Sequence, residues 1–124
     1  MKKLNMDLNY GVKKDYSKLD EWQKTSNQYT VTLKYDGRQM TIPFFTGQGW
    51  SKDPEVADVV SCLVSDYSCI ESSRDFYDFC DNLGYDSDSR KSLNTYNQCL
   101  NQSKKLEKLL GPDLNQIIKQ YENY

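Results

Sequence analysis

Histidine is absent from this chain of 124 residues, and proline occurs only three times. Without histidine, a serine or cysteine nucleophile lacks its usual general base, and a metal site would have to use thiolates and carboxylates. No segment approaches the ~20 apolar residues that span a bilayer, and no apolar run follows Met1-Lys2-Lys3. We therefore expect a cytoplasmic protein that is not an enzyme, holds no cofactor or metal and has no membrane-spanning segment.

The four cysteines are too widely spaced for a zinc site. They are separated by 7, 11 and 19 residues, at Cys62, Cys69, Cys80 and Cys99. Structural zinc sites use closely spaced cysteine pairs. We interpret the cysteines as reduced thiols that serve as small core residues in the cytosol, with a disulfide or a structural metal as the alternative.

Carboxylates are concentrated in the middle of the chain. Between Asp53 and Ser89 ten of them are opposed by a single cation, Arg74, so this segment carries −9 in a chain of net charge −2. Residues 1–52 carry +4 and residues 90–124 carry +3. A surface of one sign selects partners of the opposite sign. Two interpretations stay open: solvated helix faces and caps, or a binding surface that imitates the phosphate rows of DNA and occupies a basic groove.

A β-hairpin over residues 29–45 has the clearest local pattern. Apolar residues alternate with polar ones from Tyr29 to Tyr35, the period of a half-buried strand. Asp36-Gly37 supplies the two residues at positive φ that a type I′ turn needs, so Tyr35 should pair with Arg38. Pro43 has no N–H to donate, which predicts an edge strand or the end of a strand.

Helical spacing of apolar residues follows the hairpin. It predicts helices at about 54–67, 74–83, 88–110 and 114–121. The expected N-caps are Asp53, Ser73, Asp86 or Ser87, and Asp113, and the expected ends are Gly84 and Gly111-Pro112. The expected inward residues include Phe76, Phe79, Cys80 and Leu83, then Leu93, Tyr96, Leu100, Ser103, Leu106 and Leu110.

These elements predict an α+β fold. A hairpin or small antiparallel sheet should pack on a bundle of about four helices, which forms a single domain over residues 29–124. A polar, irregular and partly mobile segment, residues 1–28, should precede it. The pattern is compatible with a monomer or a homodimer.

The candidate partner-binding residues belong to the acidic segment. Asp75, Asp78 and Asp81 recur at the spacing of one helix flank, which points to water and not into a pocket. Asp86 and Asp88 follow, and Tyr77 and Tyr85 are the candidate anchors, since tyrosine is enriched at the centres of interfaces.

A nucleic-acid face in the C-terminal half is the alternative. Its candidate residues are Arg90, Lys91, Lys104, Lys105 and Lys108, with Tyr96, Tyr121 and Tyr124 for base stacking. The sequence pI near 5.1 and the acidic segment oppose direct binding of nucleic acid.

A resemblance to known proteins is found in two stretches, Gly37–Phe44 and Asp75–Lys91, and the second extends to Tyr96 and Cys99. They resemble a group of small, mostly uncharacterised proteins of tailed phages, prophages and other mobile elements, over about residues 29–111. No reaction is known for this group that could be assigned to the present chain. Small accessory proteins of such elements often inhibit host defence. The resemblance therefore implies an anti-defence inhibitor of the anti-CRISPR type, with a CRISPR effector or a restriction enzyme as its partner.

Overall fold

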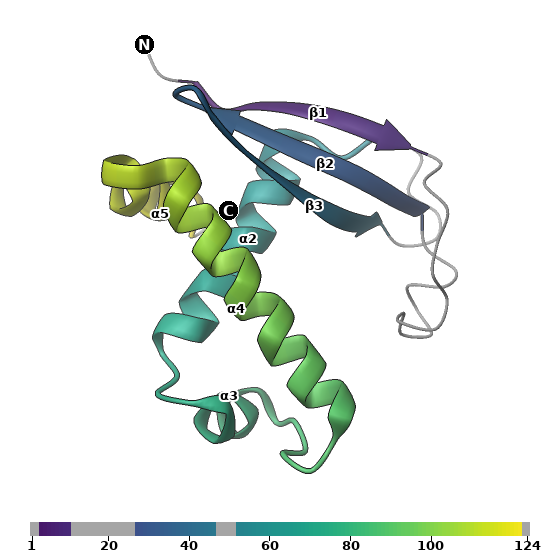
Figure 1. Ribbon diagram of the computed structural model, residues 1–124, viewed down its shortest axis with the longest axis vertical. Coiled ribbons are helices and arrows are strands. Elements are labelled where there is room, and N and C mark those ends of the chain that lie inside the picture. Colours follow the sequence, from purple (N-terminus) through teal and green to yellow (C-terminus); the bar gives the residue numbers. More distant parts are fainter. Residues whose placement is uncertain (1–2, 11–26, 47–51, 123–124) are drawn as a thin grey trace. The chain divides into compact units, whose positions relative to one another are not determined.

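The computed structural model describes residues 3–10, 27–46 and 52–122. The chain divides into two compact units, Met1–Val59 and Val60–Tyr124, and helix α2 (Val56–Glu71) crosses the boundary (Figure 1). The first unit contains a β-sheet and the second contains helices, so the predicted α+β class is confirmed. Within these residues every helix is too short or too polar to traverse a bilayer.

The first unit is built on a three-stranded antiparallel sheet. Its strands are β1 (Asn5–Tyr10), β2 (Asn27–Tyr35) and β3 (Arg38–Thr46), in the order β1-β2-β3. Tyr35 pairs with Arg38, and both turn residues have positive φ, 52° at Asp36 and 78° at Gly37. The predicted hairpin and its register are confirmed.

Pro43 shows why β3 tolerates a proline. The two-residue turn makes Tyr35 and Arg38 a hydrogen-bonded pair, and such pairs recur at every second residue. Pro43 lies opposite Thr30 at a non-bonded position, so its nitrogen faces the outer edge of β3. The missing N–H removes no bond to β2 and interrupts the row of donors on the edge, as the edge-strand prediction requires.

The expectation that residues 1–28 are irregular is wrong for Asn5–Tyr10, which form β1. Met6 pairs with Leu33 and Leu8 pairs with Val31, so the apolar residues of β1 extend the apolar face of β2. Two asparagines and an aspartate hide this alternation, since both residue types are depleted in strands. The expectation is wrong for residues 27 and 28 as well, since β2 begins at Asn27. Residues 1–2 and 11–26 of the predicted segment lie outside the described residues.

One face of the hairpin is buried almost completely. Six apolar side chains on this face are at most about one-twentieth exposed: Tyr29, Val31, Leu33, Tyr35, Met40 and Ile42. Burial of six large apolar side chains is the main stabilising contribution in this unit, at roughly 1.5–3 kcal/mol for each fully buried side chain. The Tyr29 hydroxyl donates to Asp53 Oδ1 at 3.2 Å, which satisfies its polar end.

The helices are close to their predicted ranges. After α2 come α3 (Phe76–Leu83), α4 (Arg90–Leu110) and α5 (Leu114–Tyr121), and a 3-10 turn, η2 (Gly111–Asp113), joins the last two. The first three begin two residues later than predicted. The expected number of about four helices is slightly off, because η2 is a fifth helical element among the described residues.

Three predicted N-caps are wrong. Asp53 lies before α2, which begins at Val56, and it binds Tyr29 instead. The N-cap of α3 is Asp75 in place of Ser73, and that of α4 is Ser89 in place of Asp86 or Ser87. Several Ser and Asp residues adjoin each cap, and the sequence does not show which one has the extended backbone that an N-cap requires.

The other helix ends follow the sequence. Asp113 occupies the N-cap position of α5, although its side chain makes no capping bond. Gly84 ends α3 with φ 72°, and Gly111 ends α4 with φ 53°. Both angles lie in the region that glycine adopts most easily, so the predicted ends are confirmed.

The core of the second unit draws on all of its α-helices. Its buried apolar residues are Val60, Leu63, Val64, Phe79, Cys80, Leu106, Leu109, Leu110 and Ile117. Leu83 and Leu93 were expected inward but are 39% and 43% exposed. Thirteen residues at about 100° each place Leu93 about 140° around the helix from Leu106, so it misses the buried side of α4.

Candidate functional site

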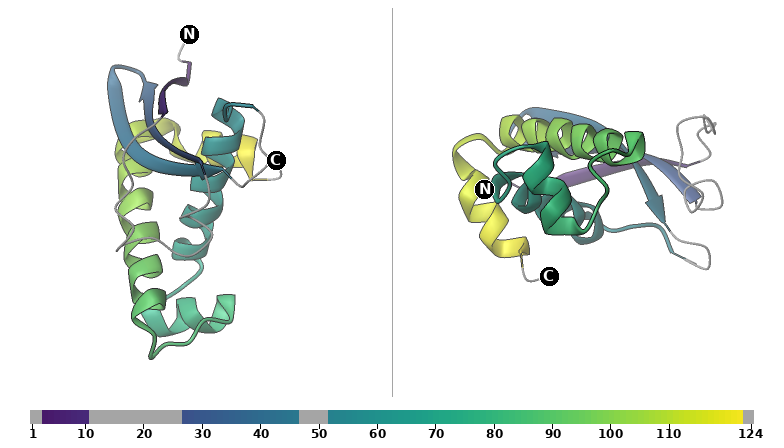
Figure 2. Two further views of the ribbon diagram at one scale, coloured as in Figure 1. Left: turned by 90° about the vertical axis from the view of Figure 1, so that its right-hand side faces the viewer. Right: turned by 90° about the horizontal axis from the view of Figure 1, so that it is seen from below.

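Helix α3 and the first turns of α4 form one end of the second unit. The ring of Tyr96 on α4 lies edge-on to Phe76 and Phe79 of α3, at centroid distances of 5.5 and 5.1 Å. Figure 2 shows α3 beside the beginning of α4 in both views. These edge-to-face contacts fix the helix that contains Asp78 and Asp81 and is capped by Asp75.

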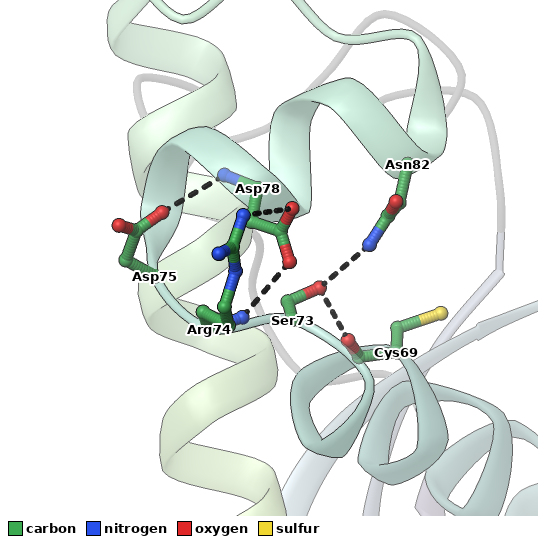
Figure 3. A network of polar contacts seen from close by, with 6 residues as sticks. All are labelled: Cys69, Ser73, Arg74, Asp75, Asp78 and Asn82. Atoms are coloured by element: carbon green, nitrogen blue, oxygen red, sulfur yellow. Dashed lines mark hydrogen bonds and ion pairs between the residues drawn. The ribbon is translucent and has the colours of Figure 1, made fainter.

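The N-terminus of α3 uses two of these carboxylates. The Asp78 N–H donates to Asp75 Oδ1 at 2.9 Å, and Asp78 Oδ2 accepts from the Arg74 N–H at 3.0 Å (Figure 3). Asp78 also lies 3.7 Å from the Arg74 guanidinium. This arrangement resembles a capping box, except that the return bond reaches the N–H of Arg74, one residue before the N-cap. Asp75 and Asp78 therefore have structural roles in starting the helix.

Ser73 connects α3 to the end of α2. Its hydroxyl donates to the Cys69 carbonyl at 2.7 Å and accepts from the Asn82 side-chain amide at 3.4 Å (Figure 3). The predicted cap residue thus bonds backward to α2 and across to α3. The turn between the two helices is held at both ends.

The loop from α3 to α4 is ordered by backbone bonds. The Tyr85 N–H donates to the Cys80 carbonyl at 2.8 Å across Gly84, and the Tyr85 ring packs on Phe79 at 6.0 Å. This is the bond and the apolar contact of a Schellman motif. Asp86 Oδ1 then accepts from the Asp88 N–H at 2.9 Å. Tyr85 and Asp86 therefore have local structural functions as well.

Asp81 and Asp88 differ from the other three candidate carboxylates. Both are exposed, and their side chains make no hydrogen bond or ion pair with any described residue. Neither caps a helix, so local structure does not explain them.

Negative potential converges near the end of α3. Burial raises the pKa of the Cys80 thiol, and the charges of Asp81 and Asp86 raise it further. Both carboxylates therefore lie close enough to act on the same buried atom, although the loop at Gly84 separates them in sequence. Asp81 from the helix flank and Asp86 from the loop therefore lie near each other at the C-terminal end of α3.

Exposed apolar side chains accompany the acids. Among the described residues, every large hydrophobic side chain that is exposed lies in the segment 77–93: Tyr77 at 66%, Leu83 at 39%, Tyr85 at 45% and Leu93 at 43%. Sequence analysis selected the two tyrosines but placed the leucines in the core. We call these four residues, with Asp75, Asp78, Asp81, Asp86 and Asp88, the acidic–apolar surface.

A half-buried thiol–carboxylate pair was missed by the sequence analysis. The Cys99 thiol on α4 hydrogen-bonds the Asp66 carboxylate on α2. Burial raises the pKa of Asp66, and burial together with the charge of Asp66 raises the pKa of Cys99 to about 12. Burial and then Asp66 raise the pKa of Cys69 as well. Thirty-three residues separate Asp66 from Cys99, so no local motif indicates the pair.

These raised pKa values disfavour thiol chemistry. A thiolate is the nucleophile and the metal ligand, and the shifts keep Cys69, Cys80 and Cys99 protonated at neutral pH. All four cysteines are free thiols. Within residues 3–10, 27–46 and 52–122, no three Cys, Asp or Glu side chains are grouped to hold a metal ion.

The alternative basic residues all lie on α4. The side chains of Arg90, Lys91, Lys104, Lys105 and Lys108 are exposed. Tyr96 packs against α3, so it is not available for the base stacking that the sequence analysis assigned to it. Tyr124 lies outside the described residues.

No family model, no curated protein and no solved structure matches this chain. The geometry of the second unit therefore carries the functional argument.

Proposed function

We propose that this chain is a non-enzymatic accessory protein of a phage or another mobile element that inhibits a host defence nuclease in the bacterial cytoplasm. The partner would be a CRISPR effector or, as the second class, a restriction enzyme. Inhibition would follow from protein–protein binding through the acidic–apolar surface, whose carboxylates would stand in for DNA phosphates in a basic groove.

The observation that supports this proposal is the coincidence of two features on one segment. Exposed large apolar side chains at 77–93 coincide with five carboxylates at 75–88. Interfaces combine apolar anchors at their centre with charges that select the partner and speed its encounter. Solvation of a helix end would explain the exposed carboxylates, but it would not explain why the Tyr77 side chain is 66% exposed.

Charge reversal at Asp81 and Asp88 tests the surface without disturbing the helix cap. Phage plating would be measured on hosts with different CRISPR or restriction systems, with and without the expressed chain. We expect the wild-type chain to restore plating on one host, and D81K/D88K to lose that effect. Loss of a buried interfacial charge pair costs about 2–5 kcal/mol, so affinity for the purified nuclease should fall by roughly tenfold or more.

The matched control is E107K/E122K, which changes the net charge equally at exposed positions outside the acidic–apolar surface. It should retain full protection. A wild-type chain that protects none of the hosts would contradict the inhibitor function. Protection by D81K/D88K equal to wild type would contradict the assigned surface. Y77A tests the apolar component, and we expect it to weaken binding as well.

A further inference from the structure

The side of α4 that faces away from the buried Leu110 has an unusual composition. At about 100° per residue, nine exposed residues fall within an arc of about 140° centred near Asn94. They are Arg90, Lys91, Asn94, Asn97, Gln98, Asn101, Lys104, Lys105 and Lys108. We call them the α4 polar face. It holds five cations and four amides and no carboxylate.

The two kinds of residue are separated along the helix. Arg90 and Lys91 lie at one end and the lysines from Lys104 to Lys108 at the other, about 21 Å apart at 1.5 Å per residue. The four amides fill the space between them. Glu107 is the only carboxylate in α4, and it lies about 100° from the line through Arg90 and Lys108.

Helix stability does not account for this composition. Asparagine is a poor helix former, less favourable than alanine by about 0.7 kcal/mol or less per residue, and three asparagines stand on this face. A solvated helix face is usually supported by opposite charges at i,i+3 or i,i+4, but within α4 only Lys104 and Glu107 have such a spacing.

We infer that the α4 polar face is a binding site for duplex DNA. Lysine and arginine neutralise phosphates, while asparagine and glutamine pair with the N6 and N7 edge of adenine. A helix about 10–12 Å across fits the major groove, which is about 12 Å wide. The order of charges and amides along α4 places phosphate contacts at both ends and base contacts between them.

The same face disfavours the other nucleic acids. Single strands bind on exposed aromatic rings, and none lies on this face, since Tyr96 is turned toward Phe76 and Phe79. The major groove of an RNA duplex is too narrow for side chains to read. Asp86 and Asp88 precede Arg90 and weaken attraction at that end, so the lysines from Lys104 to Lys108 should contribute most of the affinity.

Fluorescence anisotropy with the full chain and a labelled duplex of mixed sequence tests this site. We expect binding at about 50 mM salt that weakens steeply toward 200 mM. K104Q/K105Q/K108Q should bind at least about tenfold more weakly and lower the salt slope by about 0.9 for each lost phosphate contact. N97A/N101A should keep the slope but lose the sequence preference that selection from a randomised duplex library reveals.

K3Q/K52Q/K119Q is the matched control, with the same change of charge at exposed lysines outside the α4 polar face. It should bind like wild type, and circular dichroism should show equal helix content in both triple variants. No binding at low salt, an equal loss in the control, or preference for a single strand or an RNA duplex would each overturn the site. None of these outcomes depends on nuclease inhibition.

Discussion

Cys99 illustrates how one residue changes its chemistry through a partner distant in sequence. Its thiol donates to Asp66 and has a pKa of about 12, because burial and a nearby negative charge both oppose ionisation. The sequence analysis interpreted the cysteines as small core residues, which fits Cys80 at 1% exposure. It did not find the carboxylate that suppresses thiolate formation at Cys99.

Alkylation should therefore discriminate strongly among the four thiols. Cys62 is exposed, whereas raised pKa values protect Cys69, Cys80 and Cys99. We expect iodoacetamide at pH 8 to modify Cys62 first and Cys99 slowly, as read by peptide mass spectrometry. In D66N the charge that suppresses ionisation is removed, so Cys99 should react faster. Equal rates for all four native thiols would contradict this description.

At the scale of the element, the carboxylates at the start of α3 cap the helix and also belong to the candidate binding surface. The segment from Ser72 to Asp78 offers several side chains able to cap, and the sequence analysis chose the wrong one. Its choice of Gly84 was correct, because positive φ selects glycine without reference to other residues. The hairpin turn at Asp36-Gly37 was predictable for the same reason.

Two substitutions at Asp75 separate capping from charge. D75A removes the acceptor of the Asp78 N–H bond and should lower the free energy of unfolding by about 1 kcal/mol. D75S keeps a side-chain oxygen at the cap while removing the charge, and should stay within a few tenths of a kcal/mol of wild type. Urea unfolding measures both. An equal loss in D75S and D75A would mean that the charge, and not the cap, stabilises α3.

At the scale of the whole molecule, the groups of the described residues whose pKa departs from its ordinary value all shift in the same direction. The pKa values of Asp66, Tyr67, Cys69, Cys80 and Cys99 are all raised. The folded chain therefore binds protons at these groups more tightly than the unfolded chain. Because stability rises with pH only where the unfolded state binds more protons, these groups make stability fall as pH rises.

Urea unfolding across pH should show this loss in two windows. Asp66 lowers stability as pH rises from its ordinary pKa of 3.8 through its raised pKa in the folded state. The thiols lower stability above their ordinary pKa of 9.0. D66N should be less sensitive to pH in the lower window, and C99A should be less sensitive above pH 9. If the unfolding free energy of the native chain does not fall relative to that of D66N as pH rises from the acid range toward neutrality, the raised pKa of Asp66 is contradicted.

Charge is also segregated at this scale, with carboxylates on the acidic–apolar surface and cations on the α4 polar face. The acidic surface could be predicted in outline, because ten carboxylates and a single cation lie between Asp53 and Ser89. Leu83 and Leu93 could not be assigned to it, since apolar residues near a helix end are buried or exposed according to the helix that packs against them.

Local sequence patterns were enough to predict the α+β class, the hairpin register and the glycine helix ends, because these depend on neighbours within a few residues. The third strand, the actual N-caps, the pairing of Asp66 with Cys99 and the exposure of two expected core leucines became apparent only in the folded chain. Each of these depends on which segments meet in space. The alternation in Asn5–Tyr10 becomes a strand only beside β2, and the pKa of the Cys99 thiol is raised because the fold partly buries it and places it beside the carboxylate of α2.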